Sequence, residues 1–418
     1  MLEYKDSSST VVESTENELK KLAKAGGLLF TRGDLGRAFD AYERSRAIRA
    51  KLAAKAPFNI QRQRELAASI DDTGRVLEAQ GNFSAALQAY NRSGLITVRL
   101  IALDPEDATL HGDFGVSFLN VGRVQEAEGE FARALKSYEE SHGIATRLTT
   151  LEPDNLVWQR LLGISCDHIG RVLFAQNALE AARESFDQSR QILMKLVQKE
   201  PFNKVWQQDL CASLDDVGRV LCRQGDLVGA LETYNQAGFI RANLAEKEPA
   251  DAARQRDLSV SHDNVGRVLE TQGNLAGALD AYNRSGFICA ELSAKEPSRT
   301  HWQEDLCVSL DNVGRVLEAQ DNLGGALASY EQSRSLVTQL VQRDLLNVRW
   351  QRMLSTSLAS VVRLLTARGD LVEALALEEQ RSALCPQLAN GASDERVFVM
   401  REVERRRVCR GEVRQAGH

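Results

Sequence analysis

Apolar residues recur along this chain at the spacing of amphipathic helices. A clear first stripe consists of Leu306, Leu310, Val313 and Leu317. After a short polar break, a second stripe consists of Leu323, Leu327, Tyr330 and Val337. Steps of three or four residues place each stripe on one face of a helix. The pattern predicts an antiparallel pair of roughly 22-residue helices, each about 33 Å long, and no segment shows a strand pattern.

The same pattern returns every 48 residues. A glycine in the first helix marks the copies, at Gly26, Gly74, Gly122, Gly170, Gly218, Gly266 and Gly314, and the next step reaches Val362. In the second helix an alanine is followed four residues later by an aromatic residue, as at Ala326 and Tyr330, but the last copy has Glu378 instead. Eight copies predict an all-α fold, an α-solenoid of about eight antiparallel helix pairs.

Two kinds of helix breaker keep the same phase. Six of the seven prolines share one phase, and proline disfavours helical geometry in the residue before it, so each one marks a helix end. A glycine in the turn between the two helices supplies the second break, at Gly33, Gly81, Gly225, Gly273 and Gly369.

Small and aromatic residues indicate how the helices pack. A glycine inside a helix costs about 1 kcal/mol relative to alanine, so its return in seven copies implies a gain from close packing. We expect Ala326 of the second helix to face Gly314. All four tryptophans, for example Trp158, share one phase, and we expect them to join the start of one pair to the end of its predecessor.

The residues Leu310, Val313, Gly314, Leu317, Ala326, Tyr330 and Ser333 resemble the signature of the tetratricopeptide repeat, in a long-helix variant. The usual unit has about 34 residues, and the 14 additional residues fit two more turns on each helix. The resemblance covers residues 16 to 386. It implies that the first helices line a concave groove that binds a peptide or a partner's helix, and it implies no chemistry.

The repeats predict three segments. Residues 1–14 are expected to be disordered, because Thr15, Glu16, Asn17 and Glu18 resemble a capping box that begins the first helix. Residues 15–386 form the solenoid. Residues 387–418 form a basic tail, interpreted as a capping helix or as a segment that binds acidic surfaces or the protein's own groove.

A row of polar residues follows the predicted groove. An arginine follows the glycine position in all but the first copy, and an acidic residue four positions earlier accompanies it in five copies. The candidate partner-binding residues are Arg75, Asn120, Arg123, Arg171, Arg219, Asn264, Arg267, Asn312, Arg315 and Arg363. They either clamp acidic side chains or a terminal carboxylate, or form a mutually neutralised lining that holds register. Arg123 and Arg363 follow Leu119 and Ala359 instead of an acid, so we expect them to contact a ligand most directly.

Composition narrows the class of partner. The chain has 52 Lys and Arg against 58 Asp and Glu, a net charge of −6, which argues against nucleic acid. No stretch approaches 18 uncharged apolar residues, so no membrane partner is expected. Seven cysteines form no CxxC pair, which favours reduced thiols in a cytoplasmic protein. No phosphate-binding loop, metal-ligand spacing or singular catalytic cluster occurs, so we expect no cofactor, metal or catalytic residue.

The sequence therefore predicts a non-enzymatic interaction scaffold or adaptor that binds a protein or peptide, possibly an acidic one, in a charged groove. An alternative is the sensor or regulatory array of a signalling system, working with a separate effector or nucleotide-switch protein. A third hypothesis, a hidden enzyme, requires a polar cluster found in only one repeat. The sequence leaves the oligomeric state open.

Overall fold

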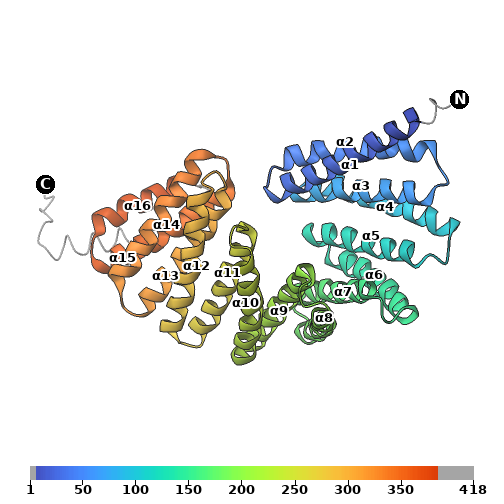
Figure 1. Ribbon diagram of the computed structural model, residues 1–418. Coiled ribbons are helices and arrows are strands. Elements are labelled where there is room, and N and C mark those ends of the chain that lie inside the picture. The colour runs from blue at the N-terminus through green and yellow to red at the C-terminus, as the bar shows by residue number, and fades with distance from the viewer. Residues whose placement is uncertain (1–5, 385–418) are drawn as a thin grey trace, which may run out of the picture. The chain divides into compact units, whose positions relative to one another are not determined.

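The computed structural model describes residues 6–384, with side chains from residue 14 onward. Sixteen helices and no strand occur in this part of the chain (Figure 1), which confirms the predicted all-α fold. The helices are α1 (Asp6–Thr31), α2 (Leu35–Lys55), α3 (Ile60–Ala79), α4 (Phe83–Leu103), α5 (Ala108–Ala127), α6 (Phe131–Leu151), α7 (Leu156–Ala175), α8 (Leu179–Lys199), α9 (Lys204–Gln224), α10 (Leu227–Lys247), α11 (Ala252–Thr271), α12 (Leu275–Lys295), α13 (Thr300–Ala319), α14 (Leu323–Arg343), α15 (Val348–Arg368) and α16 (Leu371–Leu384).

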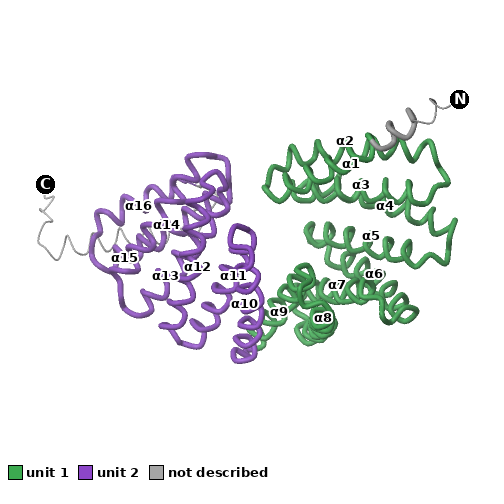
Figure 2. Tube along the Cα trace, in the orientation of Figure 1, with its two compact units in different colours: residues 1–224 green, residues 225–418 purple. Residues whose placement is uncertain are grey.

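The chain divides into two compact units between Gln224 and Gly225 (Figure 2). Unit 1 contains α1 to α9, and unit 2 contains α10 to α16. Within each unit every helix packs against the next helix in the chain. In unit 1, α5 also contacts α7, and α7 contacts α9, so these first helices of successive pairs lie side by side.

The turn inside each pair requires a residue with a left-handed backbone. Six glycines have φ between 76° and 95° there, namely Gly33, Gly81, Gly129, Gly225, Gly273 and Gly369. Asn177 and Asp321 occupy the equivalent position in two other pairs, with φ of 62° and 61°. Glycine adopts this conformation without strain, and Asn and Asp tolerate it better than other residues do. The glycines predicted as turn residues therefore end the first helix as expected.

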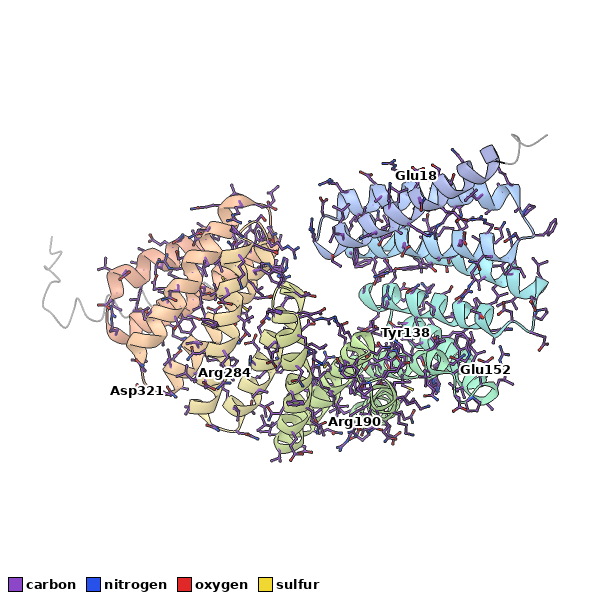
Figure 3. All side chains as sticks on the ribbon, in the orientation of Figure 1. Glu18, Tyr138, Glu152, Arg190, Arg284 and Asp321 are labelled. Atoms are coloured by element: carbon purple, nitrogen blue, oxygen red, sulfur yellow. The ribbon has the colours of Figure 1, made fainter. Side chains whose placement is uncertain are left out.

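Each of several helix pairs is closed by an aromatic ring that lies against the glycine of the first helix. A Cβ atom added to Gly314 would lie 2.7 Å from Cε1 of Tyr330, and one added to Gly74 would lie 2.7 Å from Cε1 of Tyr90. The same arrangement involves Tyr42, Tyr138, Phe186 and Tyr282; Tyr138 is labelled within unit 1 in Figure 3. The ring of Tyr330 fills the space that the missing side chain of Gly314 leaves. Ala326 is fully buried, and its approach to Gly314 stays a prediction.

The last pair replaces both partners of this contact. Val362 stands where the other pairs have glycine, and Glu378 stands where they have the ring. Both are buried, and Arg381 donates to both carboxylate oxygens of Glu378 at 2.8 Å. A larger side chain is thus accepted on the first helix only where the ring is absent, which shows that the two positions depend on each other.

Trp158 joins consecutive pairs in unit 1. Its ring lies over Gly112 of α5, and its Nε1 donates to Glu152, at the end of α6, at 2.8 Å. The predicted contact with the end of the preceding pair is confirmed for this tryptophan. Gly112 matters here because any side chain at that position would collide with the ring.

The first helix begins earlier than expected. We predicted disorder through residue 14 and a helix start at Thr15, but α1 already begins at Asp6. No glycine or proline lies between Asp6 and Lys24, so nothing in the sequence interrupts the helix before Thr15. Residues 1–5 and the predicted basic tail, 387–418, lie outside the described residues.

The contact between glycine and ring predicts a specific loss of stability. Replacing Gly266 by alanine would place a Cβ 2.7 Å from Cε1 of Tyr282, so Gly266→Ala should lower the free energy of unfolding by about 1–3 kcal/mol. Urea unfolding followed by far-ultraviolet circular dichroism measures the change. Gly143→Ala in α6 is the control, because no atom lies within 4 Å of the new Cβ; it should stabilise the chain by up to about 1 kcal/mol. Equal effects of the two substitutions would contradict the packing argument.

Candidate functional site

Arginines of the predicted row form ion pairs between consecutive first helices. Arg123 of α5 places Nε 3.1 Å from Glu78 Oε1 and Nη2 2.6 Å from Glu78 Oε2 on α3. Arg315 binds Glu270 with distances of 2.6 and 2.8 Å, and Arg363 binds Glu318 in the same manner. Arg123 and Arg363 lack an acid four positions earlier, as the sequence shows, but each pairs with a carboxylate of the preceding repeat, 45 residues earlier. Their predicted contact with a ligand stays a prediction.

A second row of ion pairs runs in parallel, and sequence reasoning missed it. Its members are Arg64 with Asp113, Arg160 with Asp209, and Arg256 with Asp305. In the last two, Nε lies 2.6 Å and Nη2 3.3 Å from the carboxylate oxygens. The arginine belongs to the earlier helix here, whereas it belongs to the later helix in the Arg123 pair. Helices α3 and α5 are therefore joined by two ion pairs of opposite direction, which favours a single register.

The remaining predicted residues have separate surroundings. Arg171 donates to Asp167 at 2.8 Å, as the four-residue spacing predicted, and also to Asp216 at 3.0 Å. Arg219 also contacts Asp216 and lies 5.7 Å from the centroid of the Phe174 ring. Arg267 donates to Asn264 at 2.6 Å. Asn120 is buried, and Asn312 is half-buried.

One polar pocket brings part of the predicted row together. It lies in unit 1 between α3 and α5, has a volume of about 590 Å³, and is lined by Arg75, Asn120 and Arg123 from the prediction. The other charged lining residues are Arg49, Arg64, Glu65, Asp71, Asp72 and Asp113. Ala68 and Val116, both exposed, contribute an apolar strip. The other seven predicted residues do not line this pocket.

Two arginines of the pocket retain unused hydrogen-bond donors. Arg49, from α2, donates Nη1 to the backbone oxygen of Glu65 at 3.1 Å, while its buried Nε has no partner. Arg75 is 52% exposed and approaches one carboxylate, Asp72, at 3.8 Å; it lies 5.5 Å from the centroid of the Phe30 ring. A guanidinium group presents five N–H donors, so both can accept a further anion.

The carboxyl group of Asp71 is unusual within the pocket. Burial is the largest cause that raises its pKa, and the carboxylates of Asp72 and Asp113 act in the same direction, while the neighbouring Ser93 hydroxyl and the charge of Arg123 oppose them; the resulting pKa is about 7. Its Oδ1 atom is buried without a hydrogen-bond partner. We expected Asp71 to pair with Arg75 along the helix, but no such ion pair forms, because the carboxyl faces Ser93 of α4 instead.

The same arrangement recurs in unit 2. Burial raises the pKa values of Asp263 and Asp311 to about 6, and each carboxyl faces a serine of the second helix. These carboxyl groups are therefore costly to ionise in the folded chain.

The pocket shows few features of a catalytic centre. Its lining contains no histidine or cysteine, and Ser93 Oγ donates to the backbone oxygen of Ala67 at 3.1 Å. No cluster of three or more potential metal-ligating side chains occurs among the described residues. The described helices also include none with the length and apolar character needed to cross a membrane. Because this polar lining occurs in one place, the hidden enzyme stays a hypothesis, although the geometry favours binding.

No protein-family model matches the chain, and no curated protein matches it. Among solved structures, a signal-transduction ATPase with numerous domains from Pyrococcus horikoshii, which has a tetratricopeptide repeat sensor, is similar with a TM-score of 0.56 and 11% identity. The match covers 90% of this chain and 54% of that protein. The fold is of the tetratricopeptide type.

Two further structures are similar at lower scores. BtubC from P. vanneervenii has a TM-score of 0.49 and 18% identity, covering 62% of this chain and 92% of that one. A Rap protein complexed with Competence and Sporulation Factor has a TM-score of 0.46 and 12% identity, covering 94% of this chain and 99% of that one. At these identities the likeness concerns the fold alone.

The ion pair between Arg123 and Glu78 should couple the two repeats energetically. In a double-mutant cycle with Arg123→Met and Glu78→Gln, we expect a coupling energy of about 1–3 kcal/mol, because both groups are mostly buried and bonded through two contacts. Urea unfolding of the four proteins measures it. The exposed pair Arg133 and Glu130 is the control, with an expected coupling below about 0.5 kcal/mol. A coupling near zero for both pairs would contradict a role in holding register.

The pKa of Asp71 predicts a pH-dependent contribution to stability. A carboxyl whose pKa rises from 3.8 to about 7 on folding favours the folded state below its unfolded pKa, and this contribution is lost as the pH rises through about 7. Asp71→Asn should therefore raise the free energy of unfolding relative to wild type at pH 8 by at least about 1 kcal/mol, with a smaller gain at pH 5. Urea unfolding at the two pH values tests it, and the exposed Asp40→Asn should show no such difference. A gain that is the same at both pH values would contradict the assignment.

Proposed function

We propose that the protein is a non-enzymatic interaction scaffold that binds an acidic segment of a partner protein in the pocket between α3 and α5. The observation that supports this most directly is the contrast among the four arginines of the pocket. Arg64 and Arg123 are each bonded through two contacts to a carboxylate, whereas Arg49 and Arg75 have donors left over. Unused guanidinium donors in a cavity are suited to a carboxylate, which they bind through two parallel hydrogen bonds.

The rest of the lining supports a peptide as the ligand. Ala68 and Val116 offer an apolar surface beside the charged groups, and Val116 is 42% exposed. A volume of about 590 Å³ accommodates a few side chains. Because the pKa of Asp71 is raised to about 7, part of this carboxyl is protonated at neutral pH, which lowers the negative charge of the lining. An acidic side chain flanked by apolar residues satisfies both features.

The chain as a whole carries a net charge of −6. A chain that is acidic overall repels acidic partners at long range, so binding depends on the pocket rather than on general attraction. The arginines that pair with carboxylates, namely Arg171, Arg219, Arg315 and Arg363, support the interpretation of a neutralised framework at their own positions, whereas Arg267 donates to the neutral amide of Asn264. Their contact with a partner, like that of Asn264 and Asn312, stays a prediction, as does the alternative of a sensor array working with a separate effector.

A peptide selection tests the proposal. A random peptide library displayed on phage is selected on the full chain, and enriched peptides are synthesised and titrated by fluorescence anisotropy. We expect enriched peptides to carry Asp or Glu next to apolar residues. Arg49→Gln combined with Arg75→Gln should weaken the binding of these peptides by at least tenfold, because the two guanidinium groups with unused donors are lost. A tenfold loss of affinity corresponds to about 1.4 kcal/mol.

The matched control changes the same charge elsewhere in unit 1. Arg37 and Arg133 have highly exposed side chains and do not line the pocket, so Arg37→Gln with Arg133→Gln should leave the affinity unchanged. Enriched peptides without acidic residues, or equal binding to both double variants, would overturn the proposal.

A further inference from the structure

Unit 2 contains a second pocket whose chemistry differs from that of unit 1. It has a volume of about 630 Å³ and is lined by α12, α13 and α14. Its apolar lining residues are Phe287, Ala290, Leu306, Leu310, Val313 and Leu336. No charged side chain lines it; Asn283 and Gln332, both exposed, supply amides at its edge.

The pocket lies beside Gly286, a position that carries a long side chain in some other repeats and glycine in α4 and α10, as Gly94 and Gly238. Gly286 stands where α8 has Arg190, labelled in Figure 3, and where α14 has Arg334. Those arginines are held by ion pairs with Asp187 and Glu331, at 3.0 and 2.5 Å. Without such a side chain, Leu306 and Leu310 of α13 are left beside a cavity, and Phe287 is 67% exposed at its edge.

The described chain ends on an apolar cluster that reaches one side of this pocket. Leu384, the last residue of α16, lies 48 residues after Leu336 and packs against the same apolar cluster as Leu336, which also lines the pocket. Thirty-four residues, 385–418, continue the chain from this point. Their one run of four large apolar residues is Val397, Phe398, Val399 and Met400, and charged residues precede and follow it.

The distance is compatible with a contact inside one molecule. Twelve residues separate Leu384 from Val397, and an extended chain spans up to about 43 Å over these thirteen steps. Adjacent packed helices are about 10 Å apart, so this reach is several times what is needed to pass over α14.

We propose that the pocket between α12 and α14 binds residues 397–400 of the same chain. Phe398 fills the cavity beside Leu310 and Phe287, while Asn283 and Gln332 hydrogen-bond to the backbone of the bound segment. This proposal is independent of the acidic-peptide pocket in unit 1.

Photo-crosslinking in the full chain tests the contact. Phe398 is replaced by p-benzoylphenylalanine, the protein is irradiated, and the crosslinked peptides are identified by mass spectrometry. We expect crosslinks within one molecule to residues of α12, α13 or α14 that line the pocket. A mixture of isotopically light and heavy protein distinguishes crosslinks within a molecule from those between two molecules.

A variant taken from the chain's own repeats closes the pocket. Asn283→Asp, Gly286→Arg and Phe287→Gln together reproduce Asp187, Arg190 and Gln191 of α8. A Cβ on Gly286 meets Ser309 at 3.6 Å, an ordinary contact, so the helix accepts the change. This variant should reduce the crosslink at least fivefold while keeping the helical circular dichroism, and trypsin should cleave after Arg396 and Arg401 faster than in wild type.

Three outcomes would overturn the proposal. They are the absence of crosslinks to the pocket, crosslinks formed only between two molecules, and crosslinks and cleavage rates that the three substitutions leave unchanged. If the variant fails to fold, as circular dichroism would show, the crosslink map of the chain with its pocket intact still decides between a contact inside the molecule and any other arrangement.

Discussion

The close approach of the two helices at the glycine is the constraint from which the other contacts follow. The ring of Tyr90 can lie on α3 only because Gly74 has no side chain. In that position its hydroxyl donates to Glu78 at 2.8 Å, one turn after the glycine, and Glu78 in turn accepts two hydrogen bonds from Arg123 of the next repeat. In unit 2 the same four positions are Gly266, Tyr282, Glu270 and Arg315. Packing inside one pair thereby sets the electrostatic contact to the next pair.

This connection explains why most arginines of the row serve structure. A carboxylate that accepts from a tyrosine hydroxyl and from Nε and Nη2 of a guanidinium group has few lone pairs left, and it neutralises the charge of that arginine. Arginines that can bind a ligand are then expected only where these contacts between tyrosine, glutamate and arginine do not form. Arg49 lies on α2, outside the row, and Arg75 faces Asp72 at 3.8 Å instead of receiving a carboxylate from the preceding helix. Both arginines line the pocket between α3 and α5.

The sequence predicted the architecture well because a 48-residue period is visible without any structure. The helix order and the turn glycines followed from it. The contact of the Tyr330 ring with Gly314 was not predicted, because helical spacing gives the buried face of each helix but not the offset between two helices.

The site was less predictable for a related reason. The pairs Arg123 with Glu78 and Arg64 with Asp113 join positions 45 and 49 residues apart, on either side of the period. Such offsets become meaningful only once neighbouring first helices are known to be parallel and adjacent. The sequence did contain a signal for the 49-residue offset, because arginine recurs in alternate copies, at Arg64, Arg160 and Arg256, and an aspartate stands 49 residues after each of them. Arg49 had none, because it lies on a second helix, which the resemblance places away from the groove.

Each pocket lies near a position that varies between repeats, and this links the sequence of the repeats to function in physical terms. At the position of Leu119, five other copies have an aspartate; the leucine is buried, so α5 adds no carboxylate there. Gly286 corresponds to an ion-paired arginine in α8 and α14 and to glycine in α4 and α10, and apolar residues of α13 line the cavity beside it. A strictly periodic array would offer the same neutral surface in every repeat. Because selectivity requires surfaces that differ, the substitutions that interrupt the period are the positions at which a partner can distinguish one repeat from another.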